Sequence, residues 1–337
     1  MNDVNPAADL VATTLIPHTA FDTAAKRIYQ CCKFGMRASD PVCLAVVGES
    51  RTGKSRLLEE CGAAFPPTRT EAGIVMPVLC VSTPSKPTVK GLAAEMLRAI
   101  GDPRHAEGTE ITKTARLHHL MPEIGSRVLL IDEFQHFYDK GTNQVMHHVA
   151  DWLKILVDQT KVVLIVSGLP TCRQVIDQNE QLAGRFLAPL VMPRFNWADD
   201  YLREEFLAIL AAFHEALSEH FEMPDLASEE MGLRMYCATG GLMGYITRLL
   251  RQLVWNTMDA KKVRICLADF AKAHGDCHWG PEDEPLFETF TAGFRALPTP
   301  DILARAALLG TKRENVQTSS HGSLSVKPKA SLVLSAS

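Results

Sequence analysis

The loop GESRTGKS at residues 48–55 is the feature that most constrains this chain, because it directly follows an apolar run. It fits the spacing G-x-x-x-x-G-K-[ST], with Gly48, Gly53, Lys54 and Ser55 in the fixed positions. Glycines let successive backbone N–H groups face inward, and these groups, with the N-terminus of a following helix, form a pocket for phosphate. The run before the loop predicts a buried strand and the residues after it predict a helix, which is the context the motif requires. The sequence therefore predicts a nucleotide-binding site rather than a flexible surface loop.

The residues of this loop have separable expected roles. Lys54 can reach the β- and γ-phosphates of ATP, and the Ser55 hydroxyl can ligate Mg²⁺. The residues expected to contact the nucleotide are Gly48, Glu49, Ser50, Arg51, Thr52, Gly53, Lys54, Ser55 and Arg56.

A second apolar run, VLLIDEF at residues 128–134, ends in two acids. Ligands bind at the carboxyl ends of such strands, where the phosphate loop also lies. Asp132 is placed to orient Mg²⁺ through its water shell, and Glu133 to polarise a water for attack on the γ-phosphate. Because a small-molecule kinase has no need for that second acid, the pair favours hydrolysis. A third run, VVLIVSGLP, ends in Ser167, whose hydroxyl either holds the attacking water or γ-phosphate or serves as an ordinary cap.

Strand and helix patterns alternate through the first part of the chain, which implies a parallel sheet covered by helices on both faces. After Pro193 the strand signals stop, and helical stripes, with Ser228 as a cap, predict a small helical domain. Strands are expected at 42–47, 74–81, 128–131, 161–166 and 187–192, with helices at 21–34, 54–64, 86–100, 109–121 and 142–160 between them. The predicted division is an N-terminal arm (1–20), an α/β nucleotide-binding domain (21–194), a helical lid (195–278) and a C-terminal extension (279–337) that ends in a Ser-rich, disordered tail.

Composition narrows the class of protein. The chain has 337 residues and a net charge of −4, so any nucleic-acid contact must come from a local basic patch. The nine cysteines form no C-x-x-C pair, and Cys43, Cys80 and Cys266 lie in apolar runs, which predicts buried thiols in a reducing compartment. No apolar run approaches 18 residues and no secretory signal opens the chain, so a soluble cytoplasmic protein with no membrane contact is expected. The histidine pairs at 118–119 and 147–148 lack i, i+4 ligand spacing, so zinc is not expected.

Together these motifs resemble those of an AAA+ ATPase, and more narrowly those of the TniB/TnsC transposition regulators. The likeness covers about residues 20–275 and rests on GESRTGKS, IDEFQHF, SGLP, QLAGRF and TGGLMGYITRLLR. It implies an AAA+ P-loop fold with a helical lid, and ATP-dependent assembly on double-stranded DNA as a homo-oligomeric ring or helical filament. It also implies a DDE transposase and a TniQ-like targeting protein as partners, with ATP hydrolysis controlling disassembly.

The resemblance also implies residue roles. The phosphate loop matches that of the family, and Asp132 and Glu133 match its Mg²⁺ and water-activating acids. Ser167 falls where the family has its sensor-1 polar residue, a position often filled by Asn. Arg185 falls where an arginine that faces a neighbouring subunit is expected, and Arg248 lies near the sensor-2 position, although the spacing there is looser than the usual G-x-x-R. The expected catalytic residues are therefore Glu133, Lys54, Arg185 and Ser167, with Arg248 as a further nucleotide contact.

DNA contact is expected from residues 86–116, between the second and third predicted strands. Six cations and four acids give this segment a balance of +2 in a chain of net −4. Phosphate contacts fix register without reading sequence, which suits a regulator that acts at varied sites. The alternative is a solvated helix–loop–helix face. The candidates are Arg104 and Lys113, which flank the polar loop, then Lys86 and Lys90, and after them the tail residues Lys312, Arg313, Lys327 and Lys329.

Two other functions stay open on the sequence alone. One is a nucleotide-switched AAA+ ATPase that acts on protein partners only, and the other is a replication-type loader. DNA-stimulated ATPase activity distinguishes a DNA-bound regulator from an ATPase that acts on protein partners only. The identity of the neighbouring genes distinguishes a transposition regulator from a replication-type loader.

Overall fold

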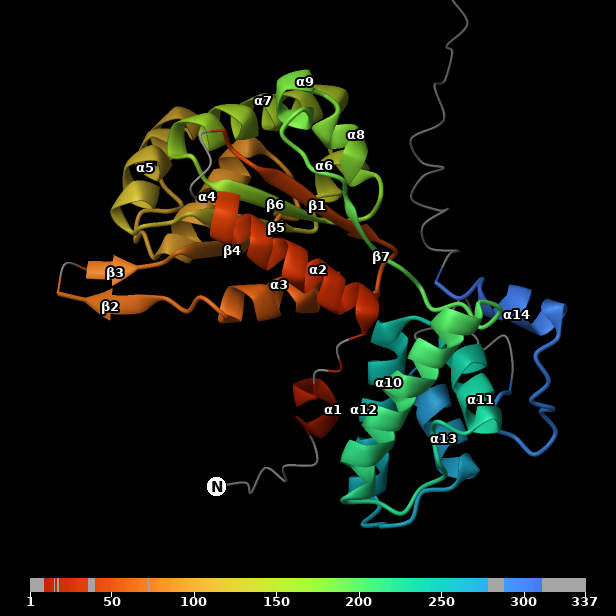
Figure 1. Cartoon of the computed structure of the whole chain (residues 1–337). Coiled ribbons are helices and arrows are strands. Elements are labelled where there is room, and N and C mark those ends of the chain that lie inside the picture. Colours follow the sequence, from red (N-terminus) through yellow and green to blue (C-terminus); the bar gives the residue numbers. More distant parts are fainter. Residues whose placement is uncertain are drawn as a thin grey trace, which may run out of the picture.

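A five-stranded sheet forms the centre of the larger part of the molecule (Figure 1). The computed structural model describes residues 9–14, 16, 18–35, 40–71, 73–277 and 288–310. The strand order is β4-β5-β6-β1-β7 and every pair is parallel. The bounds are β1 Cys43–Gly48, β4 Val78–Ser82, β5 Val128–Asp132, β6 Val163–Gly168 and β7 Leu190–Met192. Near-continuous apolar strands are typical of a parallel sheet that is buried on both faces, so the predicted fold class is confirmed.

Helices cover both faces of this sheet and form a separate hydrophobic core on each (Figure 1). One face packs against α2 (Thr19–Gln30), its five-residue π-helical continuation η2 (Cys31–Gly35), and α3 (Lys54–Ala63). The other face packs against α4 (Val89–Ile100), α5 (Glu110–Glu123) and α7 (Asn143–Thr160), with the short helices α6 (His136–Asp139), α8 (Cys172–Ile176) and α9 (Glu180–Ala183) at its rim.

A helical domain follows β7 and has its own core. Its helices are α10 (Asp200–Ser218), α11 (Glu229–Thr239), α12 (Met243–Asp259) and α13 (Leu267–Asp276). The Ser228 hydroxyl caps α11 by accepting a hydrogen bond from the Met231 N–H, as predicted. Two segments from the ends of the chain also pack on this domain: α1 (Leu10–Thr13) and α14 (Pro300–Ala306). None of the described helices is both long and apolar enough to cross a membrane.

Three expectations differ from the structure. The predicted strand 74–81 is divided, because Pro77 has no N–H to donate within a continuous ladder. The start of the predicted strand belongs to β3 (Gly73–Val75), which forms an antiparallel hairpin with the preceding β2 (Thr68–Thr70). The rest of the predicted strand is β4. Cys80 and Cys266 are exposed rather than buried, although Cys43 is buried. Helix α14 was not predicted; its signals are a Thr299 cap and a proline in the first turn. The tail after residue 310 lies outside the described residues.

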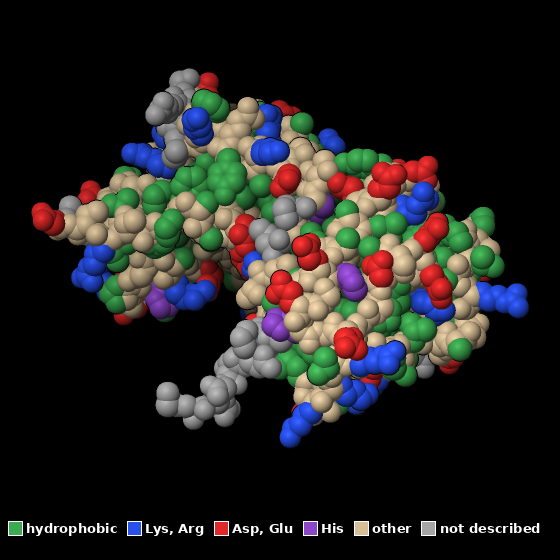
Figure 2. All heavy atoms as spheres, turned by 60° about the horizontal axis from the view of Figure 1, so that its bottom comes forward, with side chains coloured by type: hydrophobic (Ala, Val, Ile, Leu, Met, Phe, Trp, Pro, Cys, Tyr) green, Lys and Arg blue, Asp and Glu red, His purple; other side chains and the backbone are tan. Residues whose placement is uncertain are grey.

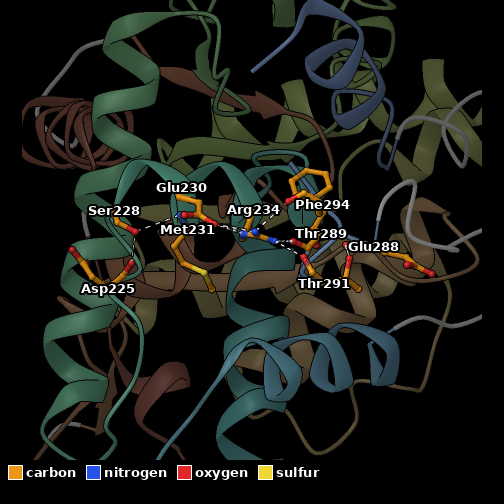
Figure 3. Close-up of polar contacts among 9 residues, drawn as sticks. All are labelled: Asp225, Ser228, Glu230, Met231, Arg234, Glu288, Thr289, Thr291 and Phe294. Atoms are coloured by element: carbon orange, nitrogen blue, oxygen red, sulfur yellow. Dashed lines mark hydrogen bonds and ion pairs between the residues drawn. The ribbon is translucent and has the colours of Figure 1, made fainter. Parts of the chain in front are cut away.

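The last described segment, residues 288–310, is here called the C-terminal strap. Figure 3 shows how the guanidinium of Arg234, in α11, points at the start of this strap. Arg234 is 5% exposed and donates hydrogen bonds to the carbonyls of Thr289 (2.6 Å), Thr291 (3.1 Å) and Phe294 (3.2 Å). The carboxylate of Glu230 accepts a further bond at 2.9 Å. A single buried cation therefore fixes the strap to the lid.

Replacing Arg234 with Met is expected to lower the free energy of unfolding of the lid by roughly 2–4 kcal/mol. The long apolar side chain still fills the space, but three strap carbonyls lose a charged donor. Chemical denaturation followed by circular dichroism measures the change. The matched control is Glu230→Gln, where a cost below about 1 kcal/mol is expected because the Glu230 side chain is 69% exposed. Equal losses in the two variants would contradict the role given to the buried carbonyl contacts.

Candidate nucleotide site

The phosphate loop opens into a cavity of about 590 Å³, a volume typical of small-molecule sites. Most of its lining comes from the loop itself at 49–56, the region after β5, the start of α12, and the N-terminal residues up to the start of α2, with further contributions from Leu169, Arg194 and Phe213. The last described residue, Gly310, also lines it. The cavity therefore lies where the sheet domain, the lid and both ends of the described chain meet.

The loop has the backbone that its glycines predict. Gly53 has a φ of 96° and Arg51 one of 68°, both in the left-handed region, and α3 begins at Lys54 immediately after Gly53. The Lys54 ammonium donates to the carbonyls of Gly48 (2.9 Å) and Glu49 (2.6 Å). The Thr52 hydroxyl donates to the same Glu49 carbonyl at 2.9 Å. The loop is thus closed upon itself beside the N-terminus of α3, the end of a helix that favours anions.

The two acids lie at the carboxyl end of β5, as predicted. The Asp132 carboxylate accepts a hydrogen bond from the Glu133 N–H at 2.9 Å. Glu133 has a φ of 56°, a left-handed conformation that is uncommon for a residue with a side chain. Its carboxylate lines the cavity and lies 3.6 Å from Nε2 of His136. The strained turn therefore aims Glu133 at the cavity that the phosphate loop opens into.

Gln135 holds Glu133 in place and was not among the predicted site residues. Its amide nitrogen donates to the Glu133 carboxylate at 2.5 Å, and its amide oxygen accepts from the Leu169 N–H at 3.2 Å. Gln135 is 6% exposed and lines the cavity. A polar residue between the buried Phe134 and Phe137 is the signal that could have identified it.

Ser167 lies near the carboxyl end of β6, and its predicted contact with a phosphate or water stays a prediction. It is fully buried in β6, opposite Val46 of β1, and its hydroxyl has no hydrogen-bond partner among the described residues. It is absent from the residues that line the cavity.

The lid closes directly on the apex of the phosphate loop. The Gly244 N–H donates to the Arg51 carbonyl at 2.8 Å, and the Arg51 guanidinium stacks 4.5 Å from the centre of the Tyr245 ring. A side chain at Gly244 would not fit, since its Cβ would lie 2.8 Å from that of Arg51. Arg248 is not among the cavity-lining residues, whereas Thr247 and Arg251 of the same helix are. Arg248 directly follows Thr247 in α12, but its side chain is not one of those from this helix that line the cavity.

The expected N-terminal arm supplies one wall of the cavity. Val11, Ile16, His18 and Phe21 line it, and Val11 is part of the lid core. His18 is 7% exposed and its ring packs edge-on against Phe195 at 5.1 Å. Burial lowers the pKa of His18, outweighing the opposing effect of nearby carboxylates. The boundary expected at residue 20 therefore passes through a wall of the site.

Arg194 is a second residue that sequence reasoning missed. It follows β7, whose last residue Met192 pairs with Gly48, so it emerges beside the phosphate loop. Its guanidinium donates to the Glu49 carboxylate, with Nε at 3.0 Å, and to the Gly240 carbonyl in the lid at 3.0 Å. It also donates to the Leu309 carbonyl in the strap at 2.8 Å. A polar residue directly after a predicted core strand, at the end shared with the loop, was the available signal.

Arg185 lies at the opposite end of β1 from the phosphate loop. The Cys43 N–H, at the start of β1, donates to the Arg185 carbonyl at 3.0 Å. The Arg185 guanidinium forms an ion pair with Asp158 at 2.5 Å, and its side chain is 23% exposed. A six-residue strand spans about 20 Å, so this guanidinium does not serve its own loop.

The predicted DNA-contacting residues divide into two groups. Lys86, Lys90 and Arg104 are exposed. Lys113 corrects the prediction, since it is 1% exposed and its ammonium donates to the His105 carbonyl. Its long side chain turns inward to hold the polar loop between α4 and α5, and so it is not presented to a duplex. The two remaining cations of the segment are paired: Arg98 with Glu95, and Arg116 with Asp102.

The donor set suits Mg²⁺ held jointly with phosphate. Within the described residues, no three His, Cys, Asp or Glu side chains are placed to hold a metal ion by themselves. Mg²⁺ retains several waters and is usually bound through one or two carboxylates together with substrate phosphates. The Ser55 hydroxyl at the start of α3 lines the cavity, and the Asp132 carboxylate ends β5 just before the lining residue Glu133, so the two have the chemistry for that shared arrangement.

Comparison with known proteins is consistent with this geometry. The family model for the bacterial TniB protein matches residues 7–197. No curated protein sequence matches the chain.

Solved structures show the same fold at low sequence identity. The ORC2 protein of Aeropyrum pernix, in ADPNP–ADP complexes, superposes with a TM-score of 0.57 at 12% identity over 80% of this chain and 71% of that one. Cdc6p of Pyrobaculum aerophilum gives 0.57 at 10% identity over 91% and 84%. The ORC1 protein of A. pernix, in complex with DNA, gives 0.56 at 14% identity over 80% and 69%. These neighbours establish an AAA+ fold with a helical C-terminal region.

Proposed function

This chain belongs to the TniB family, and we propose that it is an ATP-hydrolysing regulator of transposition that assembles on double-stranded DNA. In this proposal the DNA-bound oligomer engages a DDE transposase and a TniQ-like targeting protein, and hydrolysis releases it. The observation that carries the proposal is the convergence of Lys54, Glu133 and the lid on one cavity of about 590 Å³. Family membership supports transposition, and the site supports the nucleotide chemistry.

ATP would be held by several groups of this chain. The N–H groups of the loop and the N-terminus of α3 would bind the phosphates, and Lys54 would exchange its loop carbonyls for them. Ser55 and Asp132 would hold Mg²⁺, which neutralises charge on the transferring phosphate. The largely apolar wall formed by Val11, Ile16 and Phe21 suits a nucleobase.

Glu133 would orient and polarise the attacking water. The Gln135 side chain donates a hydrogen bond to one Glu133 carboxylate oxygen and accepts one from the Leu169 N–H just after β6. These two bonds fix the orientation of the Glu133 carboxylate. The hydrogen bond from Gln135 also couples the orientation of Glu133 to the end of β6, where Leu169 begins the next turn.

Arg185 would act on a neighbouring subunit. Its guanidinium is far from its own loop, and the ion pair with Asp158 is partly exposed, so little is lost when it is exchanged for a phosphate. Arginines supplied in trans raise the rate of phosphoryl transfer by roughly 10³–10⁵.

A protein-only ATPase is the second candidate, and the mixed charge on one face of the molecule favours it (Figure 2). Figure 2 shows basic and acidic side chains interspersed over one face of the molecule, without a continuous basic field. Measuring ATP hydrolysis with and without duplex DNA separates the two functions. Stimulation by DNA is expected for the transposition regulator, whereas hydrolysis that is indifferent to DNA, together with no ATP-dependent DNA binding, would favour the alternative.

Binding and hydrolysis should be separable by mutation. Lys54→Ala removes the cation that faces the phosphates and is expected to abolish ATP binding in a titration with a fluorescent analogue. Glu133→Gln keeps the shape and loses the charge of the base, so it should bind ATP normally and lose hydrolysis by about 10²-fold or more. A glutamine variant that hydrolyses ATP at the normal rate would rule out Glu133 as the water-activating residue.

The trans role of Arg185 can be tested by mixing variants. Arg185→Ala and Lys54→Ala should each be inactive alone, and mixtures should regain part of the activity because some interfaces pair an intact arginine with an intact loop. Asp158→Asn is the matched control, since it breaks the same ion pair but keeps the arginine, and it should retain most of the ATPase rate. Equal losses in Arg185→Ala and Asp158→Asn, with no recovery on mixing, would assign the ion pair a purely structural role.

The exposed cations of the α4–α5 region should contribute phosphate contacts. The triple change Lys86→Ala, Lys90→Ala and Arg104→Ala is expected to weaken binding to duplexes of any sequence. Each lost contact should flatten the slope of log K against log salt by about 0.9. A matched loss of three charges in the lid, Lys261→Ala, Arg264→Ala and Lys272→Ala, should leave that slope nearly unchanged. The same slope for both triple variants would place the DNA surface elsewhere.

A further inference from the structure

Arg194 joins three parts of the molecule that are distant in sequence. Its one guanidinium bonds the carboxylate of Glu49 in the phosphate loop, the carbonyl of Gly240 at the end of α11, and the carbonyl of Leu309 in the C-terminal strap. The Arg194 side chain is only 10% exposed, whereas that of Glu49 is 39% exposed, so the guanidinium is shielded from water while its carboxylate partner lies at the surface of the cavity. A residue with so many fixed partners cannot reach a phosphate without releasing them.

The strap and the loop share one donor atom. Nη2 of Arg194 bonds both the Glu49 carboxylate and the Leu309 carbonyl. If the Glu49 carboxylate or the Leu309 carbonyl moves, the shared nitrogen moves with it, and its hydrogen bond to the other acceptor changes in length and direction. This atom is the shortest physical link between the phosphate loop and the strap.

The strap reaches the cavity through a second set of contacts. Gly310 lines the cavity and lies against Leu242 and Tyr245 of the lid. Tyr245 is the ring on which Arg51, at the apex of the phosphate loop, is stacked at 4.5 Å. The start of the strap is fixed independently by Arg234, which lies in α11 and is distant in sequence from Arg194 (Figure 3).

We propose that Arg194 is a positioning residue that couples the phosphate loop to the C-terminal strap, so that nucleotide binding and strap docking reinforce each other. Arg194 holds Glu49, and with it the loop backbone, in the conformation that receives phosphate. The Leu309 carbonyl in turn holds the guanidinium. By thermodynamic linkage, whatever the strap adds to nucleotide affinity, the nucleotide adds to strap docking. The inference rests on the proposed nucleotide-binding function.

Nucleotide affinity tests the first half of this coupling. A chain truncated after Ala307 loses the Leu309 carbonyl but keeps α14, including the buried Ala306. It should bind a fluorescent ATP analogue about 5-fold or more weakly than the full chain. A chain truncated after Gly310 is the matched control, since it keeps that carbonyl, and it should bind within about twofold of the full chain, the usual limit of independent effects.

Arg194→Lys gives the same test without truncation. A lysine keeps the charge, but its ammonium lacks the planar fork that serves Glu49, Gly240 and the strap together. We expect weakened binding in this variant, and no further weakening when it is combined with truncation after Ala307, because both changes break the same link. Additive losses would contradict the coupling.

Hydrogen exchange tests the reciprocal half and separates positioning from simple structural support. In the full chain, ADP should slow exchange in peptides that cover residues 299–310. Glu49→Gln should abolish this nucleotide-dependent protection, and peptides from α4 (Val89–Ile100) serve as the internal reference. Protection that survives in Glu49→Gln would overturn the inference, as would equal affinities of the two truncated chains. If the full chain bound no nucleotide while Lys54 was intact, the proposed function itself would fail.

Discussion

The fold depends on the burial of β1 in the interior of the sheet. β1 lies between β6 and β7, and its first four residues are fully enclosed by side chains from both faces. Because its neighbours run parallel to it, the ends of β5, β6 and β7 emerge on the same edge as the phosphate loop. The site therefore follows from strand order: once β1 is central, Glu133, Leu169 and Arg194 are all brought to one edge.

The cavity is completed by segments that the sheet does not position. The start of α12 reaches the loop through Gly244, and the side chains of Val11, Ile16, His18 and Phe21 form another wall. Val11 belongs to the lid core while Phe21 belongs to the core under the sheet, so the N-terminal segment spans the two parts. Binding a ligand here would affect the packing of both domains, which is the property needed of a nucleotide-dependent switch.

The sequence predicted the elements of the sheet well because their signals are local. Apolar runs mark four of its strands, and the glycine-bounded loop marks the end of the sheet at which the cavity lies. The wall at Val11 and His18, the contacts of Arg194 and the burial of Lys113 depend on tertiary packing between distant segments, and no local pattern encodes them. Lys113 illustrates the point, because a lysine beside a polar loop is ordinarily solvated, whereas here its ammonium is buried and donates to the His105 carbonyl. The roles given to Ser167 and Arg248 by resemblance remain predictions, and neither side chain lines the cavity.

Two arginines near β7 show how strand direction divides function. Arg185 precedes β7 and lies beside Cys43, at the start of β1, whereas Arg194 follows β7 and lies beside the loop. They are nine residues apart, yet they emerge at opposite edges of the sheet. Arg185 has one partly exposed carboxylate partner, Asp158, which in the proposed trans role it would exchange for a phosphate on another subunit. Arg194 is itself buried and is bonded to three separate segments, so it is suited to transmitting a change rather than to meeting a ligand. The two arginines thus have different surroundings because they lie at opposite ends of the parallel strands. The guanidinium of Arg185 is partly exposed to solvent, whereas that of Arg194 is enclosed between the phosphate loop, the lid and the strap.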